Sequence, residues 1–142
     1  MSENRVVYFA HPINTYDTPL EEEMLDLIRE KLPDWEIENP NKPEHEEGYQ
    51  RYKRETGNGM AYFTKEVLPK CSVAVFLAFR DRKIPAGVVK EILFFLERGK
   101  MVYQVTPEGH FFSNLSVSQD DILSVSETRA RLRDDEGNML PY

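Results

Sequence analysis

Apolar residues recur along this chain at two spacings, one typical of buried β-strands and one typical of amphipathic helices. Continuous or alternating apolar runs predict strands at 6–10, 35–39, 73–79 and 101–105. Apolar residues three and four positions apart predict helices at about 19–32, 59–70 and 85–99. Strands and helices therefore alternate from residue 6 to residue 105.

The alternation predicts the fold class. Parallel strands need crossover connections, and right-handed crossovers place helices on both faces of the sheet. We therefore expect an α/β protein with a doubly wound parallel sheet of four to five strands, flavodoxin-like in outline. The length of 142 residues fits a single domain over 1–142.

The remaining segments are less regular. The stretch 41–58 is polar and rich in turn-forming residues, so we expect either a lid or a disordered loop, and its tyrosines favour the lid. In the tail, 111–117 can supply an edge strand. Capping boxes are predicted from Thr18 to Glu21 and from Ser124 to Glu127, the second opening a helix that reaches about Asp134.

The composition of the chain argues against nucleic acids and membranes as partners. A formal net charge of -7 opposes binding to DNA or RNA, because lysine and arginine contacts to phosphates supply most of that affinity. No apolar run has transmembrane length and no leader pattern opens the sequence, so we expect a cytoplasmic protein without membrane contact. The single cysteine, Cys71, borders a predicted strand and is interpreted as a buried, inert thiol, and no Cys or His spacing suggests a metal site.

Glu91 is the candidate for chemistry. It lies in the first turns of the helix that follows the strand 73–79, and in open α/β sheets the ligand crevice lies beyond the carboxyl ends of the strands. Glu91 lies at the border of the predicted apolar stripe of this helix, and Phe94 falls outside it. The stripe consists of Val88, Val89, Ile92, Leu93, Phe95 and Leu96. By spacing alone, an ordinary solvated glutamate is the alternative.

Common cofactor and enzyme signatures are missing. The turn after the first strand reads Ala10-His11-Pro12-Ile13-Asn14, where a dinucleotide fold carries a glycine-rich loop. The P-loop, the nucleophile-elbow serine and the HExxH zinc motif are absent as well.

Two segments together resemble a known family. Tyr8-Phe9-Ala10-His11-Pro12 on the first strand and Gly87-Val88-Val89-Lys90-Glu91 on the helix resemble motifs of the nucleoside 2-deoxyribosyltransferases, and the resemblance covers about residues 6–105. It implies that Glu91 is the nucleophile and that Tyr8 hydrogen-bonds and orients it. It also implies a substrate site shaped by Ala10, Pro12 and Gly87, with no metal or organic cofactor. For Tyr8, a core aromatic is the alternative.

The sequence departs from the family pattern at positions that the family uses to contact the nucleobase of the substrate. The family has an acidic residue ahead of the glycine, where this chain has Pro85-Ala86, and His11 replaces a glycine. Leaving-group protonation therefore needs another donor. His11 has a suitable ordinary pKa and is preferred over Asp81, which is retained as a substrate-binding candidate. A turn histidine bonded to backbone is the alternative for His11.

Two functions follow as expectations. The first is cleavage or transfer of the N-glycosidic bond of a nucleoside or nucleotide, with Arg51, Lys53, Arg54 or Ser116 as contacts for a 5'-phosphate. The second is a non-catalytic nucleotide-binding or assembly module on the same scaffold. A homo-oligomer is also predicted, since related proteins complete their sites across subunits, with interface candidates Phe94, Leu140 and Tyr142.

Overall fold

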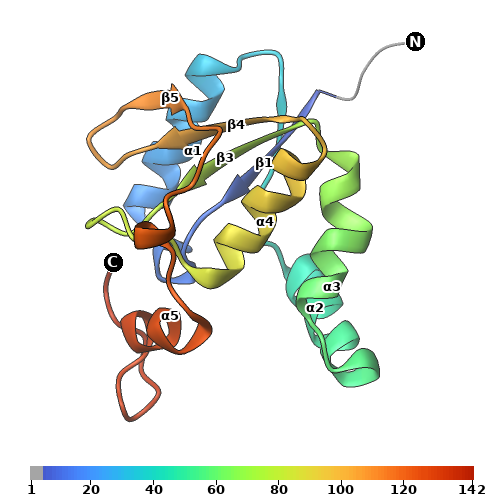
Figure 1. The fold of residues 1–142 in the computed structure, drawn as a ribbon, viewed down its shortest axis with the longest axis vertical. Coiled ribbons are helices and arrows are strands. Elements are labelled where there is room, and N and C mark those ends of the chain that lie inside the picture. Colours follow the sequence, from blue (N-terminus) through green and yellow to red (C-terminus); the bar gives the residue numbers. More distant parts are fainter. Residues whose placement is uncertain (1–4) are drawn as a thin grey trace.

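The computed structural model describes residues 5–142, and its centre is one five-stranded sheet (Figure 1). The strands are β1 (Val6–Ala10), β2 (Glu36–Glu38), β3 (Val73–Leu77), β4 (Met101–Val105) and β5 (Phe111–Ser113). Their order across the sheet is β2-β1-β3-β4-β5. The first four are parallel, as predicted, and β5 pairs antiparallel with β4. The connection 106–110 is too short for a crossover, so β5 returns as a hairpin.

Helices flank this sheet. The longer ones are α1 (Pro19–Lys31), α2 (Pro43–Thr56), α4 (Ala86–Glu97) and α5 (Val125–Leu132). Short turns complete the set: η1 (Ile13–Thr15), α3 (Met60–Tyr62), the π-helix η2 (Phe63–Val67), η3 (Leu68–Lys70) and η4 (Gln119–Asp121). The chain thus forms the mixed α/β sheet that the alternating pattern predicted.

Strands β1 and β3 are buried on both faces, because successive side chains point to opposite sides. Tyr8 and Ala10 belong to a cluster that contains the apolar face of α4. Val7 and Phe9 belong to the other cluster, which contains the apolar face of α1. Figure 1 shows α4 in front of the strands and α1 behind them.

Helix α1 begins at Pro19 with Thr18 as its cap, as predicted, but only half of the predicted capping box forms. The Thr18 hydroxyl accepts a hydrogen bond from Glu21 N at 3.3 Å, and Pro19 occupies the first turn. The other half of the box does not form, because the Glu21 carboxylate accepts from Asp17 N at 3.1 Å while Thr18 N bonds to Thr15 O. The box from Ser124 to Glu127 is present and opens α5.

The stretch 41–58 corrects the loop prediction, since most of it is helix α2. Pro43 occupies the first turn with acidic residues, basic residues occupy the last turn, and Gly57 caps the end at φ 77°. Each of these signals complements the helix dipole or its termini. The high polarity that suggested a loop reflects a helix that buries only a narrow face, at His45 and Gly48.

Helix α4 corrects the predicted apolar stripe. Phe94, placed outside it, is buried against Phe95 with the Arg98 guanidinium 3.6 Å from its ring centroid, whereas Leu93 is 40% exposed. Arg98 therefore covers the aromatic that we expected at an interface. Tyr142 also packs within the chain, where its hydroxyl donates to Ala78 O and its ring stacks on Phe79.

Within residues 5–142, no helix is long enough and apolar enough to cross a lipid bilayer.

Gly48 is expected to control how α2 packs. A Cβ atom built on Gly48 would lie 2.2 Å from the ring of Tyr62. Gly48→Ala should therefore lower the free energy of unfolding by about 1–3 kcal/mol through overpacking, measured by urea denaturation. Glu47→Ala, a neighbouring exposed position, is the control and should change stability little; equal effects of the two substitutions would contradict this packing.

Candidate active site

A cavity of about 410 Å³ lies at the carboxyl end of β1. Its walls are formed by the β1–α1 connection, α2, the α3–η2 segment, the start of α4 and the end of α5. We call it the Glu91 cavity. Its lining residues are Tyr8, His11, Pro12, Ile13, Tyr16, Pro40, His45, Glu46, Tyr49, Gln50, Met60, Phe63, Pro85, Gly87, Val88, Glu91, Thr128, Leu132 and Arg133.

Two of the predicted residues meet in this cavity. The Tyr8 hydroxyl donates a hydrogen bond to Glu91 Oε2, although the residues lie on β1 and α4. Tyr8 is held by packing on both sides, edge-on to Phe63 and stacked with Phe95 at ring-centroid distances of 6.4 Å. Because Phe95 and Glu91 are one helical turn apart, the helix that positions the carboxyl group also positions its phenol partner.

Burial sets the protonation of this pair. Glu91 is 7% exposed, and burial raises the pKa of its carboxyl group from 4.5 to about 7, although the hydrogen bond from Tyr8 acts in the opposite direction. Burial and the neighbouring Glu91 carboxylate together raise the pKa of Tyr8 well above 10. The phenol therefore remains the donor near neutral pH, while the carboxyl group exchanges its proton in that range.

Tyr16 supplies a second phenol to the same cavity. Its pKa is raised strongly, first by burial and then by the charges of Glu91 and Glu21. A neutral phenol beside a carboxylate can donate a hydrogen bond to an oxygen of a bound ligand. Sequence reasoning missed Tyr16, which lies in the turn that joins η1 to α1.

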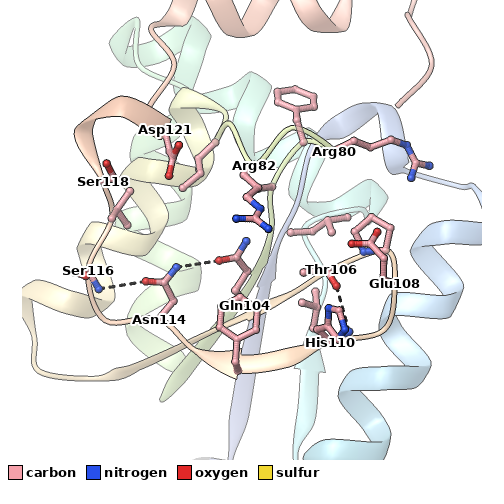
Figure 2. A pocket seen from close by; sticks show the side chains of 18 residues that line it. Arg80, Arg82, Gln104, Thr106, Glu108, His110, Asn114, Ser116, Ser118 and Asp121 are labelled. Carbon is pink, nitrogen blue, oxygen red and sulfur yellow. Dashed lines mark hydrogen bonds between the residues drawn. The ribbon is translucent and has the colours of Figure 1, made fainter.

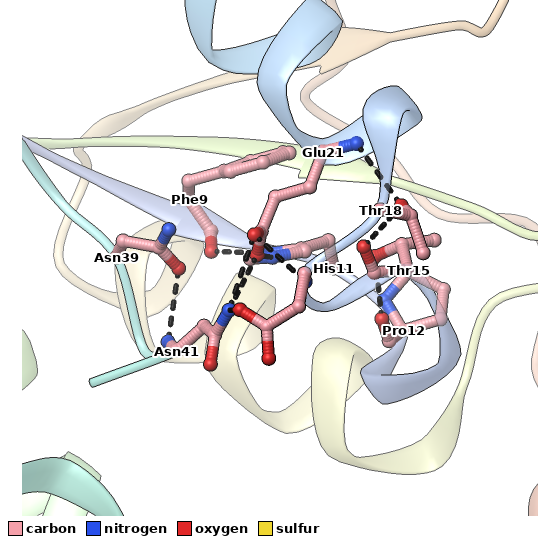
Figure 3. A network of polar contacts seen from close by, with 9 residues as sticks. Phe9, His11, Pro12, Thr15, Thr18, Glu21, Asn39 and Asn41 are labelled. Carbon is pink, nitrogen blue, oxygen red and sulfur yellow. Dashed lines mark hydrogen bonds and ion pairs between the residues drawn. The ribbon is translucent and has the colours of Figure 1, made fainter. Parts of the chain in front are cut away.

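His11 lies at the cavity wall, with both ring nitrogens engaged (Figure 3). Nδ1 is 2.9 Å from Phe9 O, and Nε2 is 2.8 Å from Glu21 Oε2. Its ring stacks on Phe9 at 4.0 Å between centroids. A carbonyl and a carboxylate are both acceptors, so each ring nitrogen of His11 faces an acceptor. A proton held here leaves for a ligand only if one of these two bonds breaks.

Glu21 anchors the turn around His11. Figure 3 shows its carboxylate reached by His11 and by Asn41, whose Nδ2 lies 3.1 Å from Oε1. Burial raises the pKa of Glu21, but hydrogen bonds from His11, Asp17 N and Asn41 outweigh that effect and lower it below 4.5. A charged Glu21 therefore ties the end of β1 to α1 and to the start of α2.

The other predicted residues fall into two groups. Pro12 and Gly87 line the Glu91 cavity, and Ala10 is fully buried beneath it at the end of β1. Asp81 does not reach this cavity. It makes a two-pronged ion pair with Arg131, at 2.8 and 2.6 Å, on the surface beside Arg80 and Tyr142.

Helix α2 adds a buried histidine that the sequence did not reveal. His45 Nδ1 lies 2.8 Å from the Tyr62 hydroxyl. Its Nε2 lies 3.1 Å from Glu38 Oε1 but makes no hydrogen bond there, so this buried nitrogen has no hydrogen-bond partner. A loop prediction for 41–58 could not place His45, Glu46 or Tyr49 at a cavity wall.

Residues 5–142 contain no group of three or more His, Cys, Asp or Glu side chains that could hold a metal ion. Cys71 is 1% exposed, and burial raises the pKa of its thiol to about 12, so it stays a neutral core side chain as predicted.

No protein-family model, curated protein or solved structure matches this chain.

The raised pKa of Glu91 predicts how stability depends on pH. Between pH 4.5 and about 7 the folded protein holds a proton that the unfolded chain releases, so stability falls as the pH rises through this window. The full loss is about 3 kcal/mol. Glu91→Gln mimics the protonated form. It should match the wild type at pH 4.5 and be more stable than it at pH 8, as measured by urea denaturation.

The matched control is Glu97→Gln, an exposed carboxylate on the same helix. It should show no such pH-dependent gain. A Glu91→Gln variant no more stable than the wild type at pH 8 would contradict the burial argument.

Proposed function

We propose that this protein cleaves the N-glycosidic bond of a nucleoside or nucleotide, with Glu91 as nucleophile and transfer to a second base or to water. The observation that carries the proposal is the Tyr8–Glu91 hydrogen bond inside a cavity large enough for a small ligand. The sheet order and the resemblance around Tyr8 and Glu91 also support a doubly wound, flavodoxin-like assignment of the fold.

The chemistry needs an ionised carboxylate against the sugar. Glu91 attacks the anomeric carbon while the bond to the base breaks, and the base leaves with the bonding electron pair and gains a proton. A covalent glycosyl ester of Glu91 results. Water or a second base then attacks the same carbon and gives its proton to the group that protonated the first base, and the carboxylate is released. Tyr8 fixes the carboxylate orientation and leaves its second oxygen free for attack.

We propose His11 as the donor of the leaving-group proton. Its place at the cavity wall supports this role, because a general acid must lie within reach of the leaving base. The role requires the 2.8 Å contact between Nε2 and Glu21 to open during the reaction.

A 5'-phosphate on the substrate would lie near Arg133. This is the arginine that lines the cavity, whereas the candidates Arg51, Lys53 and Arg54 lie outside it and Ser116 lines a different one. Among residues 5–142 its guanidinium makes one long hydrogen bond, 3.4 Å to Gly137 O, which leaves other donors for a phosphate. The substrate class favoured here is therefore a nucleotide with its phosphate toward α5.

A non-catalytic nucleotide-binding module is the second candidate. The pKa of about 7 favours it, because a Glu91 that still holds its proton is a hydrogen-bond donor rather than a nucleophile. Glu91→Gln distinguishes the two functions, because it should abolish turnover by an enzyme but leave nucleotide binding by a non-catalytic module unchanged.

Substitution of Glu91 should abolish turnover. Glu91→Gln removes the attacking oxygen charge, so release of free base should fall by about 10³-fold or more, and Tyr8→Phe should cost about 10- to 100-fold through lost orientation. The assay incubates the protein with deoxynucleosides and their 5'-monophosphates, with and without a second base, and separates the products by chromatography. Free base without acceptor identifies hydrolysis.

Glu97→Gln is the control and should keep full activity. Two further variants test the other assignments: His11→Gln should slow the release of neutral bases but not of the already cationic 7-methylguanine, and Arg133→Gln should raise KM for monophosphates only. Saturable nucleotide binding without product, unchanged in Glu91→Gln, would establish the binding module instead.

The pH profile should follow the ionisation of Glu91. The reaction needs the carboxylate, so kcat/KM should rise with pH up to about 7 as Glu91 ionises. Tyr8→Phe removes the hydrogen bond that lowers the pKa of Glu91, so the rise should move to higher pH. A shift to lower pH, or a flat profile below pH 7, would contradict Glu91 as nucleophile.

A further inference from the structure

A second cavity, of about 540 Å³, lies beyond the carboxyl ends of β3 and β4 (Figure 2). It shares no lining residue with the Glu91 cavity. The turn 78–84 forms one wall, and the β4–β5 hairpin with the following strap 114–121 forms the other. We call it the Arg82 cavity. Its position matches the edge of an α/β sheet where ligands bind, and nothing in the proposed glycosyl chemistry uses it.

The turn presents Arg82 with its charge unpaired. Phe79 N bonds to Lys83 O at 2.9 Å and Arg82 N to Phe79 O at 2.8 Å, which closes the turn and holds Arg82 at φ 73°. Within residues 5–142 the Arg82 guanidinium has no carboxylate partner, although Glu108 and Asp121 also line the cavity. Figure 2 shows these two acids on opposite sides of Arg82.

A chain of hydrogen bonds fixes a second donor. Ser116 N can only donate, and it lies 3.4 Å from Asn114 Oδ1. Asn114 therefore turns its Nδ2 toward Gln104, whose Oε1 accepts that bond at 2.9 Å. Among residues 5–142, no acceptor bonds to the two hydrogens of the Gln104 amide nitrogen. Figure 2 shows this nitrogen on the side of Gln104 toward Arg82, and both side chains line the same cavity.

Apolar side chains line the same cavity. Phe79 and Ile84 are buried, and Phe112 keeps 43% of its surface exposed. An exposed aromatic beside paired donors suits a ligand with an apolar or planar body and an anionic end. The volume exceeds what a lone oxyanion needs.

We infer that the Arg82 cavity is a binding site for a small organic anion, whose phosphate or carboxylate bridges Arg82 and Gln104 while its body packs on Phe112. A guanidinium and a primary amide together offer planar donors that match either oxyanion. Inorganic phosphate shares the anionic end but lacks the body.

The test titrates the full chain with phenyl phosphate, benzoate and inorganic phosphate, none of which contains an N-glycosidic bond. Calorimetry gives Kd, and NMR follows the side-chain amide of Gln104. We expect saturable binding that shifts this amide signal, with an organic anion binding tighter than inorganic phosphate. Whichever of phenyl phosphate and benzoate binds tighter identifies the anionic group.

Two variants localise the binding. Arg82→Asn removes the charge and keeps a residue that tolerates positive φ, and Gln104→Glu keeps the oxygen bonded to Asn114 but replaces the free donor with a carboxylate oxygen. Each should raise Kd about tenfold or more. Arg54→Asn, an exposed arginine that lines neither cavity, should leave Kd within about twofold, as should Glu91→Gln.

Three results would overturn the inference: no saturable binding of any probe to the folded wild type, neither organic anion binding tighter than inorganic phosphate, or a loss of affinity in Glu91→Gln in place of Arg82→Asn. Because Glu91→Gln removes the proposed turnover and leaves this site intact, failure of one proposal is distinguishable from failure of the other.

Discussion

The proposed chemistry depends on one contact, the hydrogen bond from the Tyr8 phenol to a Glu91 carboxyl group that is almost fully buried. Burial alone makes a carboxylate costly, and the phenol offsets only part of that cost, so the pKa of Glu91 settles at about 7. The site thus lowers stability at neutral pH in exchange for a carboxyl group that can ionise against a ligand. This is the common conflict between stability and function in a binding site.

The elements around this contact are arranged to keep it in place. Phe63 and Phe95 hold the Tyr8 ring, while the charged Glu21 joins the end of β1 to α1 through His11. The carboxyl ends of parallel strands lie at one edge of a sheet, so β1 and the helix after β3 bring these side chains together. Helix α2, with Gly48 packed on Tyr62, closes the cavity from the side.

The same sheet edge carries two cavities of different character. The Glu91 cavity is enclosed by α2, α4 and α5 and contains a buried acid, whereas the Arg82 cavity lies against the β4–β5 hairpin and contains unpaired donors. The antiparallel return of β5 contributes to the second one, because the hairpin and the strap that follows it form one of its walls. A fold can thus offer separate sites for separate ligands.

Local pattern alone determined the strands, most helix starts, the buried thiol and the acid at the start of α4, because periodicity and capping act over a few residues. It misjudged α2, whose narrow buried face leaves little apolar signal, and it placed Phe94 outside the buried face although the Arg98 side chain, one helical turn on, covers its ring. The cavity itself was decided by tertiary structure. His45, Tyr16 and Arg133 line the same cavity as Glu91 only because α2, the β1–α1 turn and α5 converge there. Asp81 lies outside this cavity and forms an ion pair with Arg131. Such contacts join segments far apart in sequence, which no local spacing encodes.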